Sequence, residues 1–293
     1  MQYIDPVFRP PSEAKSLILQ ITNGCSWNRC SFCEMYTAPQ KKFRPKPEAQ
    51  LIEELKFLHQ AGYQFPRVFL ADGDAMALSF RRLKAVLEAL QQYLPDTRRV
   101  SSYCLPRNLK NKSVEELKEL QELGLSILYV GCETGDNALL QTIDKGEDAE
   151  SSLEALQKIK QAHLKSSVMI INGLGGRQFS KQHAVNSAKL MTEAQPDYLS
   201  TLVLSFPDGP KRHQKHFNGS FEPLSQQELF EELAMFVSHL ELSRTTFRSD
   251  HASNYLVLKG TLNTDKEHIL RKLQAAIDTP ETSHLRKEWQ RGL

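Results

Sequence analysis

Cys25-Ser-Trp-Asn-Arg-Cys30-Ser-Phe-Cys33 is the stretch from which the rest of this chain can be interpreted. It holds three of the five cysteines and directly follows an apolar run, Leu17-Ile-Leu-Gln-Ile21. Thiolates are soft ligands, and short cysteine spacings select zinc, copper(I) or an iron–sulfur cluster. Three cysteines without a nearby fourth ligand suit a cluster in which one iron remains open. We therefore interpret residues 25–33, called the cluster loop below, as such a site in an enzyme.

Two other metal sites fit parts of the same pattern. Structural zinc normally takes four ligands, and His59 would be the fourth, although it falls inside a predicted helix. A plant-type [2Fe–2S] ferredoxin shares the spacing Cys-x4-Cys-x2-Cys. Its fourth ligand would have to be Cys104 or Cys132, and both lie within predicted strands, which does not fit a small ferredoxin fold.

The composition is that of an ordinary globular protein. The chain has 293 residues, of which 40% are hydrophobic and 25% charged, and its net charge is only +2. This balance gives no electrostatic case for nucleic acid or a membrane surface as a partner. No apolar run approaches the roughly 20 residues that cross a bilayer, and residues 1–11 lack the pattern of a signal peptide. With an odd number of cysteines, we expect a reducing, cytoplasmic location.

Along most of the chain, short apolar runs alternate with segments in which apolar residues recur at helical spacing. Strands are predicted at residues 17–23, 68–71, 100–104, 126–131, 167–172 and 198–204, with amphipathic helices between them. This alternation predicts an α/β fold with a parallel sheet, either a partial (β/α)6 TIM-like barrel or a doubly wound sheet. Both architectures place ligands at the carboxyl ends of the strands.

The ends of the chain are predicted to differ from this core. Residues 1–16 form an irregular N-terminal arm, residues 17–205 the core, and residues 206–293 a C-terminal extension that closes the barrel. Within the extension we expect a basic loop at 211–216, a strand at 255–258 and a frayed tail after Pro280. Ser225 and Thr264 are predicted to cap the two helices of this extension.

Unusual residues follow the predicted strands. The segments are Ala71-Asp-Gly-Asp-Ala75, Ser101-Ser-Tyr-Cys-Leu-Pro-Arg107, Gly131-Cys-Glu-Thr-Gly135 and Ile171-Asn-Gly-Leu-Gly-Gly176. A carboxylate that ends an apolar strand is costly unless it is paired, which favours a functional role for Glu133. Arg107 is suited to hold a carboxylate by two hydrogen bonds, and the glycines permit close backbone approach. Cys132 is predicted to be a packed core residue.

With these segments and the cluster loop, residues 17–205 resemble the radical SAM enzymes. The similarity is to a little-characterised bacterial group, loosely similar to oxygen-independent coproporphyrinogen oxidase-like and elongator-type radical SAM proteins. It implies a [4Fe–4S] cluster whose open iron binds S-adenosyl-L-methionine (SAM), and reductive cleavage of SAM to a 5′-deoxyadenosyl radical. The cluster loop has one residue more than the family's usual Cys-x3-Cys-x2-Cys, while Phe32 is the aromatic residue that the family carries before its last cysteine.

The resemblance also implies roles for individual residues. Asp74 stands where the family has a glutamate that receives the methionine amino group, and Asp72 replaces a glycine. The implied metal ligands are Cys25, Cys30 and Cys33, and the implied SAM-binding residues are Asp72, Gly73, Asp74, Ser102, Arg107, Glu133, Gly173, Leu174, Gly175 and Leu202. No catalytic residue is assigned.

The substrate is not determined by these patterns. The polar segment 247–255 resembles a segment of the same bacterial group, and its His251, Asn254 and Tyr255 are predicted to line the active site. The expected partners are a flavodoxin or ferredoxin-type reductant and a small-molecule substrate, which the near-neutral charge favours over RNA. Two other functions stay open: an iron–sulfur protein for electron transfer or redox sensing, and a zinc-bound interaction module.

Overall fold

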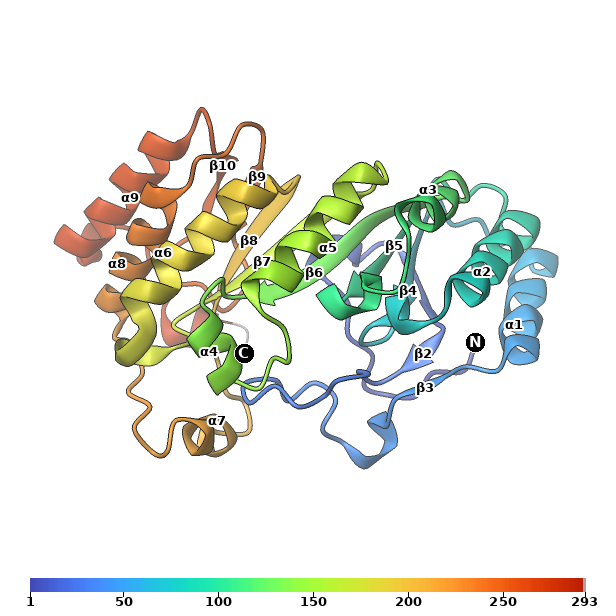
Figure 1. Cartoon of the computed structure of the whole chain (residues 1–293), viewed down its shortest axis with the longest axis horizontal. Coiled ribbons are helices and arrows are strands. Elements are labelled where there is room, and N and C mark those ends of the chain that lie inside the picture. The colour runs from blue at the N-terminus through green and yellow to red at the C-terminus, as the bar shows by residue number, and fades with distance from the viewer. Residues whose placement is uncertain (292–293) are drawn as a thin grey trace. The chain divides into compact units, whose positions relative to one another are not determined.

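The computed structural model describes residues 1–291, which divide into two compact units (Figure 1). Unit 1 comprises residues 1–28, 35–130 and 154–166, and unit 2 comprises residues 29–34, 131–153 and 167–293 as far as they are described. The fold is α/β with a mostly parallel sheet of eight strands. None of the helices in the described part of the chain is long and apolar enough to cross a membrane.

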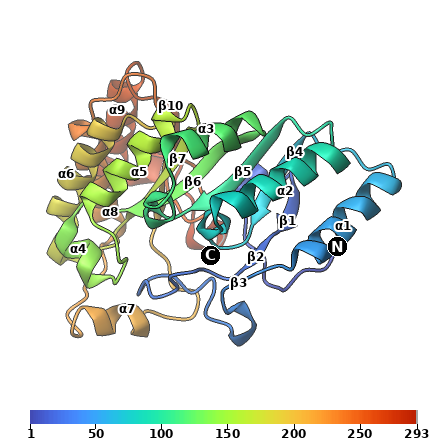
Figure 2. The same cartoon turned by 45° about the vertical axis from the view of Figure 1, so that its right-hand side comes forward.

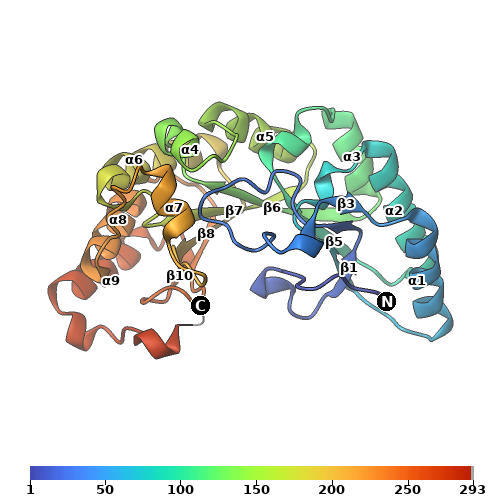
Figure 3. The ribbon, with the colours of Figure 1, turned by 90° about the horizontal axis from the view of Figure 1, so that it is seen from below.

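Unit 1 carries the strand order β1-β4-β5-β6, in which all neighbours are parallel. Helices α1 and α2 pack side by side next to these strands (Figure 3). Its strands are β1 (Leu17–Gln20), β2 (Thr22–Asn23), β3 (Arg44–Pro45), β4 (Arg67–Ala71), β5 (Arg99–Cys104) and most of β6 (Leu125–Glu133). Its helices are α1 (Glu48–Gln60), α2 (Phe80–Tyr93), α3 (Val114–Glu122), most of α5 (Ala149–Gln161) and the 3-10 turns at Pro11–Glu13, Pro39–Lys41, Ala75–Ala77 and Pro106–Leu109.

Unit 2 carries the order β7-β8-β9-β10, parallel except for the last pair. Helix α8 packs against both α6 and α9 (Figure 2). The strands are β7 (Lys165–Asn172), β8 (Tyr198–Val203), β9 (Thr246–Ser249) and β10 (Leu258–Thr261). The helices are α4 (Asn137–Thr142), α6 (Gly176–Ala194), α7 (Lys211–His216), α8 (Gln226–His239), α9 (Lys266–Asp278) and the 3-10 turns at Pro280–Thr282 and Glu288–Gln290.

The local signals in the core lead to the expected elements. All six predicted strands are present within a few residues, because continuous apolar runs are buried on both faces of the sheet. Ser113 and Ser225 form the predicted capping boxes with Glu116 and Glu228. Cys132 is a buried core residue, and burial raises the pKa of its thiol to about 12.

The N-terminal arm is irregular apart from one 3-10 turn, but it is anchored through Glu13. The Glu13 side chain is fully buried, and its carboxylate accepts hydrogen bonds from Arg99 at 2.8 Å and from the Tyr129 hydroxyl at 2.6 Å. Burial opposes ionisation, but the hydroxyl donors and Arg99 together lower the pKa of this carboxyl. The arm is thus fixed to β5 and β6 of unit 1.

Four predictions for residues 206–291 were wrong in detail. Residues 211–216 form helix α7 instead of a loop, because the His213 ring and the following Phe217 are buried. The strand expected at 255–258 starts only at Leu258, where it pairs with β9. Thr264 does not cap α9; its hydroxyl donates to the Thr261 carbonyl, and Asp265 is the N-cap residue.

Residues 281–291 are held by side-chain contacts, whereas a frayed tail is predicted after Pro280; residues 292 and 293 lie outside the described part of the chain. Arg286 donates to the carbonyls of His251 (2.6 Å) and Asn254 (3.1 Å), and the Arg291 guanidinium lies 3.8 Å from the centre of the Tyr255 ring. An arginine side chain can donate to several backbone carbonyls at once, and the two arginines thereby attach these residues to segment 250–255.

Candidate functional site

Five of the residues predicted for the site lie at or near the carboxyl ends of parallel strands. Asp72 follows β4, Ser102 lies near the end of β5, Glu133 ends β6, Gly173 follows β7 and Leu202 lies near the end of β8.

In unit 1, the first part of the cluster loop contacts the turn after β4. Asp74 accepts hydrogen bonds from the Ser26 amide at 2.8 Å, from the Ser26 hydroxyl and from Asn108 at 3.2 Å. Burial raises the pKa of Asp74, although these three donors and Arg107 work against the rise. The carboxylate therefore fixes the backbone directly after Cys25.

Gly73 is required by the close approach of two backbone segments. Its φ is +46°, and a Cβ at this position would lie 2.0 Å from the Gly24 carbonyl oxygen. The Gly73 amide donates to the Tyr36 hydroxyl at 3.0 Å. Only glycine allows the turn after β4 to lie this close to the residue before Cys25.

Asp72 has an internal partner. Its carboxylate forms an ion pair with the Lys41 ammonium, and both side chains are fully buried. The Lys41 ammonium also donates to the Ile4 carbonyl at 2.9 Å. The Asp72 carboxylate is thus buried and neutralised within unit 1, and its role in SAM binding stays a prediction.

Ser102 and Arg107 hold different parts of unit 1. The buried Ser102 hydroxyl donates to the Leu70 carbonyl at 3.2 Å, which ties β5 to β4. The Arg107 guanidinium stacks on the Trp27 ring of the cluster loop, 3.8 Å from its centre. Arg107 is thus placed against the cluster loop.

In unit 2, the second part of the cluster loop is fixed through its backbone. The Ser31 amide donates to the Ile143 carbonyl at 2.8 Å, and Arg212 of α7 donates to the Cys33 carbonyl at 2.7 Å. Cys30 is buried whereas Cys33, like Cys25, is half-buried. Burial raises the pKa of the Cys30 thiol, and the nearby Lys145 charge opposes that rise.

Glu133 and Lys145 form a buried ion pair next to Cys30. The Lys145 ammonium lies 2.8 Å from Glu133 Oε1, and their side chains are 3% and 10% exposed. Glu133 has a φ of +66°, a conformation that is unusual for a residue other than glycine. Burial alone would lower the pKa of Lys145, but Glu133, with smaller contributions from Cys30 and Cys132, raises it above its ordinary value.

The turn after β7 is held by polar contacts from two helices. The Gly173 amide donates to the Glu232 carboxylate of α8 at 2.6 Å, and the Leu174 carbonyl lies 3.1 Å from Nε2 of His213. Gly173 has a φ of +83°, and Gly175 is the N-cap residue of α6. Phe32 and Leu202 pack on the same apolar cluster as Leu174.

The side chains of the three predicted substrate residues form hydrogen bonds with other residues of unit 2. Asn254 is 3% exposed, donates to the Thr201 carbonyl at 2.9 Å and accepts from the Val203 amide at 2.9 Å. The Tyr255 hydroxyl donates to Glu288 at 2.5 Å, and burial raises the pKa of Tyr255 to about 12. Nδ1 of His251 lies 2.8 Å from the Ser253 hydroxyl oxygen.

Three residues of the site were missed by the sequence interpretation: Asn108, Lys145 and His213. Each is buried and polar, but each lies in a segment where the sequence pattern indicates only a loop or a solvated face. The only signal for Lys145 was its place in the sequence, twelve residues after Glu133 in the same loop-rich stretch.

The cysteines suit an iron–sulfur cluster in their chemistry. All five are thiols, and in unit 2 the charges of Lys145 and Arg212 act on the Cys30 thiol. Cations near cysteine favour the thiolate that a metal requires. Among residues 1–291, no three His, Cys, Asp or Glu side chains are grouped closely enough to hold a single metal ion.

These features define an α/β protein with a cysteine loop at the carboxyl ends of parallel strands. The family profile described as "Radical SAM superfamily" matches residues 19–191, so the chain belongs to the radical SAM superfamily.

Curated relatives share only part of their length with this chain. An uncharacterized methyltransferase of Synechocystis sp. (strain ATCC 27184 / PCC 6803 / Kazusa) is 26% identical over 165 residues, which is 56% of this chain and 30% of that protein. The heme chaperone HemW of Bacillus subtilis (strain 168) is 24% identical over 168 residues, 54% of this chain and 43% of that protein. The matched region therefore spans less than half of either relative.

Solved structures show the same fold. Coproporphyrinogen III oxidase (HemN) from Escherichia coli superposes with a TM-score of 0.57 at 15% identity, covering 76% of this chain and 52% of that one. Methylornithine synthase (PylB) gives a TM-score of 0.51 at 18% identity, covering 78% and 63%. The fold is accordingly that of the partial TIM barrel found in these radical SAM enzymes.

Proposed function

We propose that this protein is a radical SAM enzyme in which Cys25, Cys30 and Cys33 hold a [4Fe–4S] cluster. The reduced cluster, when bound, supplies the electron that cleaves the sulfonium of SAM to give a 5′-deoxyadenosyl radical. The chain's own residues fix the cluster loop, orient SAM and exclude water from the site. The cysteine loop at the strand ends is the observation that carries this proposal.

The contacts support different roles for the predicted residues. Asp74 holds the cluster loop at Ser26 and is the acceptor for the methionine amino group, while Asp72 is structural through its pair with Lys41. Lys145 is a second candidate, besides Arg107, for the methionine carboxylate, because its ammonium pairs with Glu133 near the predicted cluster ligand Cys30.

The remaining assignments follow the sequence. Gly73, Ser102 and Arg107 bind SAM from unit 1, whereas Glu133 and Leu202 do so from unit 2 together with Gly173, Leu174 and Gly175. A small molecule is the proposed substrate, a flavodoxin or ferredoxin-type protein the reductant, and the cytoplasm the location. His251 stays the candidate substrate contact, since the Asn254 and Tyr255 side chains have internal partners.

The test is anaerobic SAM cleavage. The protein is reconstituted with iron and sulfide, reduced with dithionite and assayed for 5′-deoxyadenosine and methionine. We expect both products from the wild type and from Cys104→Ala, a matched control outside the cluster loop, and neither from Cys30→Ala. A wild-type [4Fe–4S] cluster that neither cleaves SAM nor changes its EPR spectrum with SAM would instead favour an electron-transfer or redox-sensing protein.

A further inference from the structure

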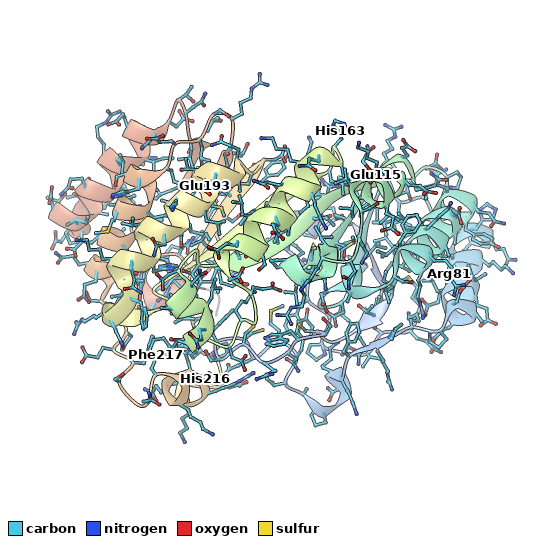
Figure 4. The ribbon with its side chains drawn as sticks, in the orientation of Figure 1. Arg81, Glu115, His163, Glu193, His216 and Phe217 are labelled. Carbon is cyan, nitrogen blue, oxygen red and sulfur yellow. The ribbon has the colours of Figure 1, made fainter. Side chains whose placement is uncertain are left out.

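His213 of helix α7 is fully buried in an aromatic environment. Its ring lies 4.7 Å from Phe217, 4.6 Å from Phe221 and 5.2 Å from Phe206, measured between centroids. Figure 4 labels the neighbouring His216 and Phe217 at the end of this helix. The environment is dry, so both ring nitrogens of His213 need partners within the protein.

Both nitrogens have partners, and the chemistry of those partners sets the direction of each hydrogen bond. Nε2 lies 3.1 Å from the Leu174 carbonyl oxygen, which can only accept, so Nε2 carries the hydrogen. Nδ1 lies 2.8 Å from the Ser31 hydroxyl oxygen and therefore accepts the hydroxyl hydrogen. Burial lowers the pKa of His213 to about 4, which agrees with this neutral ring.

The two partners belong to the two segments of unit 2 to which the sequence assigned cofactor binding. Ser31 lies between Cys30 and Cys33, and Leu174 lies in the glycine-containing turn after β7. Helix α7 adds a second contact, because Arg212 donates to the Cys33 carbonyl at 2.7 Å. One short helix from the C-terminal extension thus holds the cluster loop and the turn together.

We propose that His213 is a positioning residue that sets the distance between the Cys30–Cys33 part of the cluster loop and the Leu174 turn, and thereby the affinity for SAM. This inference rests on the proposed function. In the proposed function, the cluster binds one end of SAM and the Leu174 turn contacts another part of it. Loss of the His213 hydrogen bonds therefore weakens SAM binding without removing any group that touches SAM. Residues that orient ligands in this way typically change affinity or activity about 10–100-fold when mutated.

The test uses variants that remove one hydrogen bond or both. Ser31→Ala removes only the hydroxyl donor, and His213→Phe keeps an aromatic ring of similar size but removes both hydrogen bonds. His213→Asn keeps an acceptor near the Nδ1 position and serves as the conservative variant. Lys215→Gln, on the exposed face of the same helix, is the matched control.

Three quantities are measured on each reconstituted protein: iron and sulfide per chain, the urea midpoint of the apoprotein, and the Kd of SAM from its effect on the EPR spectrum of the reduced cluster. We expect Lys215→Gln to match the wild type. Ser31→Ala and His213→Phe should keep their iron and raise the Kd roughly tenfold. The double variant Ser31→Ala/His213→Phe should bind SAM no more weakly than His213→Phe alone, because both substitutions break the hydrogen bond between Ser31 and His213. His213→Asn should recover part of the affinity.

Two results would overturn the inference. One is an unchanged Kd and EPR response in Ser31→Ala, the mildest variant. The other is a loss of SAM binding that only tracks the loss of iron or of folded protein. A wild type that carries the cluster but does not respond to SAM would refute the proposed function itself, and that outcome is visible before any variant is examined.

Discussion

At the scale of single residues, the site depends on two buried ion pairs with different consequences. Lys41–Asp72 is sealed inside unit 1, whereas Glu133–Lys145 lies next to a predicted cluster ligand in unit 2. A buried ion pair adds little stability compared with apolar residues, but removal of one partner leaves an uncompensated charge. The two pairs should therefore separate structural from functional roles.

For the first pair, Asp72→Asn leaves the Lys41 ammonium buried without its carboxylate. We expect the free energy of unfolding in urea to fall by about 3–5 kcal/mol. SAM affinity per folded molecule should stay close to that of the wild type, because the carboxylate is fully buried. A stable variant that no longer binds SAM would return Asp72 to the list of cofactor ligands.

For the second pair, Lys145→Met should destabilise the apoprotein by about 3 kcal/mol, because Glu133 then stays buried and charged. The double variant Lys145→Met/Glu133→Leu should regain most of this loss in urea unfolding. Neither variant should show the EPR response to SAM, because both lack Lys145, the proposed partner of the methionine carboxylate. Equal stability of the single and double variants would contradict the pairing.

At the scale of elements, helices α6 and α8 meet at a buried acid and a buried base. His183 of α6 and Glu232 of α8 approach to 3.8 Å and are 2% and 3% exposed. Burial lowers the pKa of His183 to about 4 and raises that of Glu232 to about 7. Each group thus resists its charged form, with opposite effects on the dependence of stability on pH.

His183 adds stability above its unfolded pKa of 6.5, and this is lost as the pH falls towards 4. Glu232 adds stability below its unfolded pKa of 4.5, and this is lost as the pH rises towards 7. Between these limits the two contributions largely offset each other in the wild type.

Glu232→Gln should therefore remove the Glu232 contribution, so that the effect of His183 on the pH dependence of stability can be measured. Relative to the wild type, the variant should gain stability as the pH rises from 4.5 to 7, by up to about 3 kcal/mol. Urea unfolding at several pH values measures this difference, and His183→Asn should give the opposite slope. A constant difference across the range would mean that Glu232 does not titrate there.

At the scale of the whole molecule, SAM should stabilise the folded protein only when the cluster is present. A ligand that binds only the folded protein stabilises it by about 2.7 kcal/mol at a hundredfold excess over its Kd. We expect SAM at that concentration to raise the Tm of the reconstituted protein by several degrees, and to leave unchanged the Tm of protein stripped of iron by a chelator. A shift of equal size in the stripped protein would show that SAM binds without the cluster.

Much of the fold follows from local signals that the sequence carries. Apolar runs such as residues 167–172 form buried strands, and capping boxes such as Ser113–Glu116 start helices, because both effects act over a few residues. The same reasoning fails for α7, where the decisive feature is burial of the His213 ring against distant aromatic residues. The tail after Pro280 is a second such case, ordered by arginine contacts to segment 250–255.

The sequence by itself indicated the superfamily, because three cysteines within nine residues and the segments that follow the predicted strands are local features that need no tertiary information. Only the tertiary structure decided which partner each polar group takes. Asp72 meets Lys41, which is 31 residues away, and Ser31 meets His213, which is 182 residues away. Buried polar groups must be satisfied, but the choice of partner depends on how the whole chain packs, and periodicity along the sequence does not encode that choice.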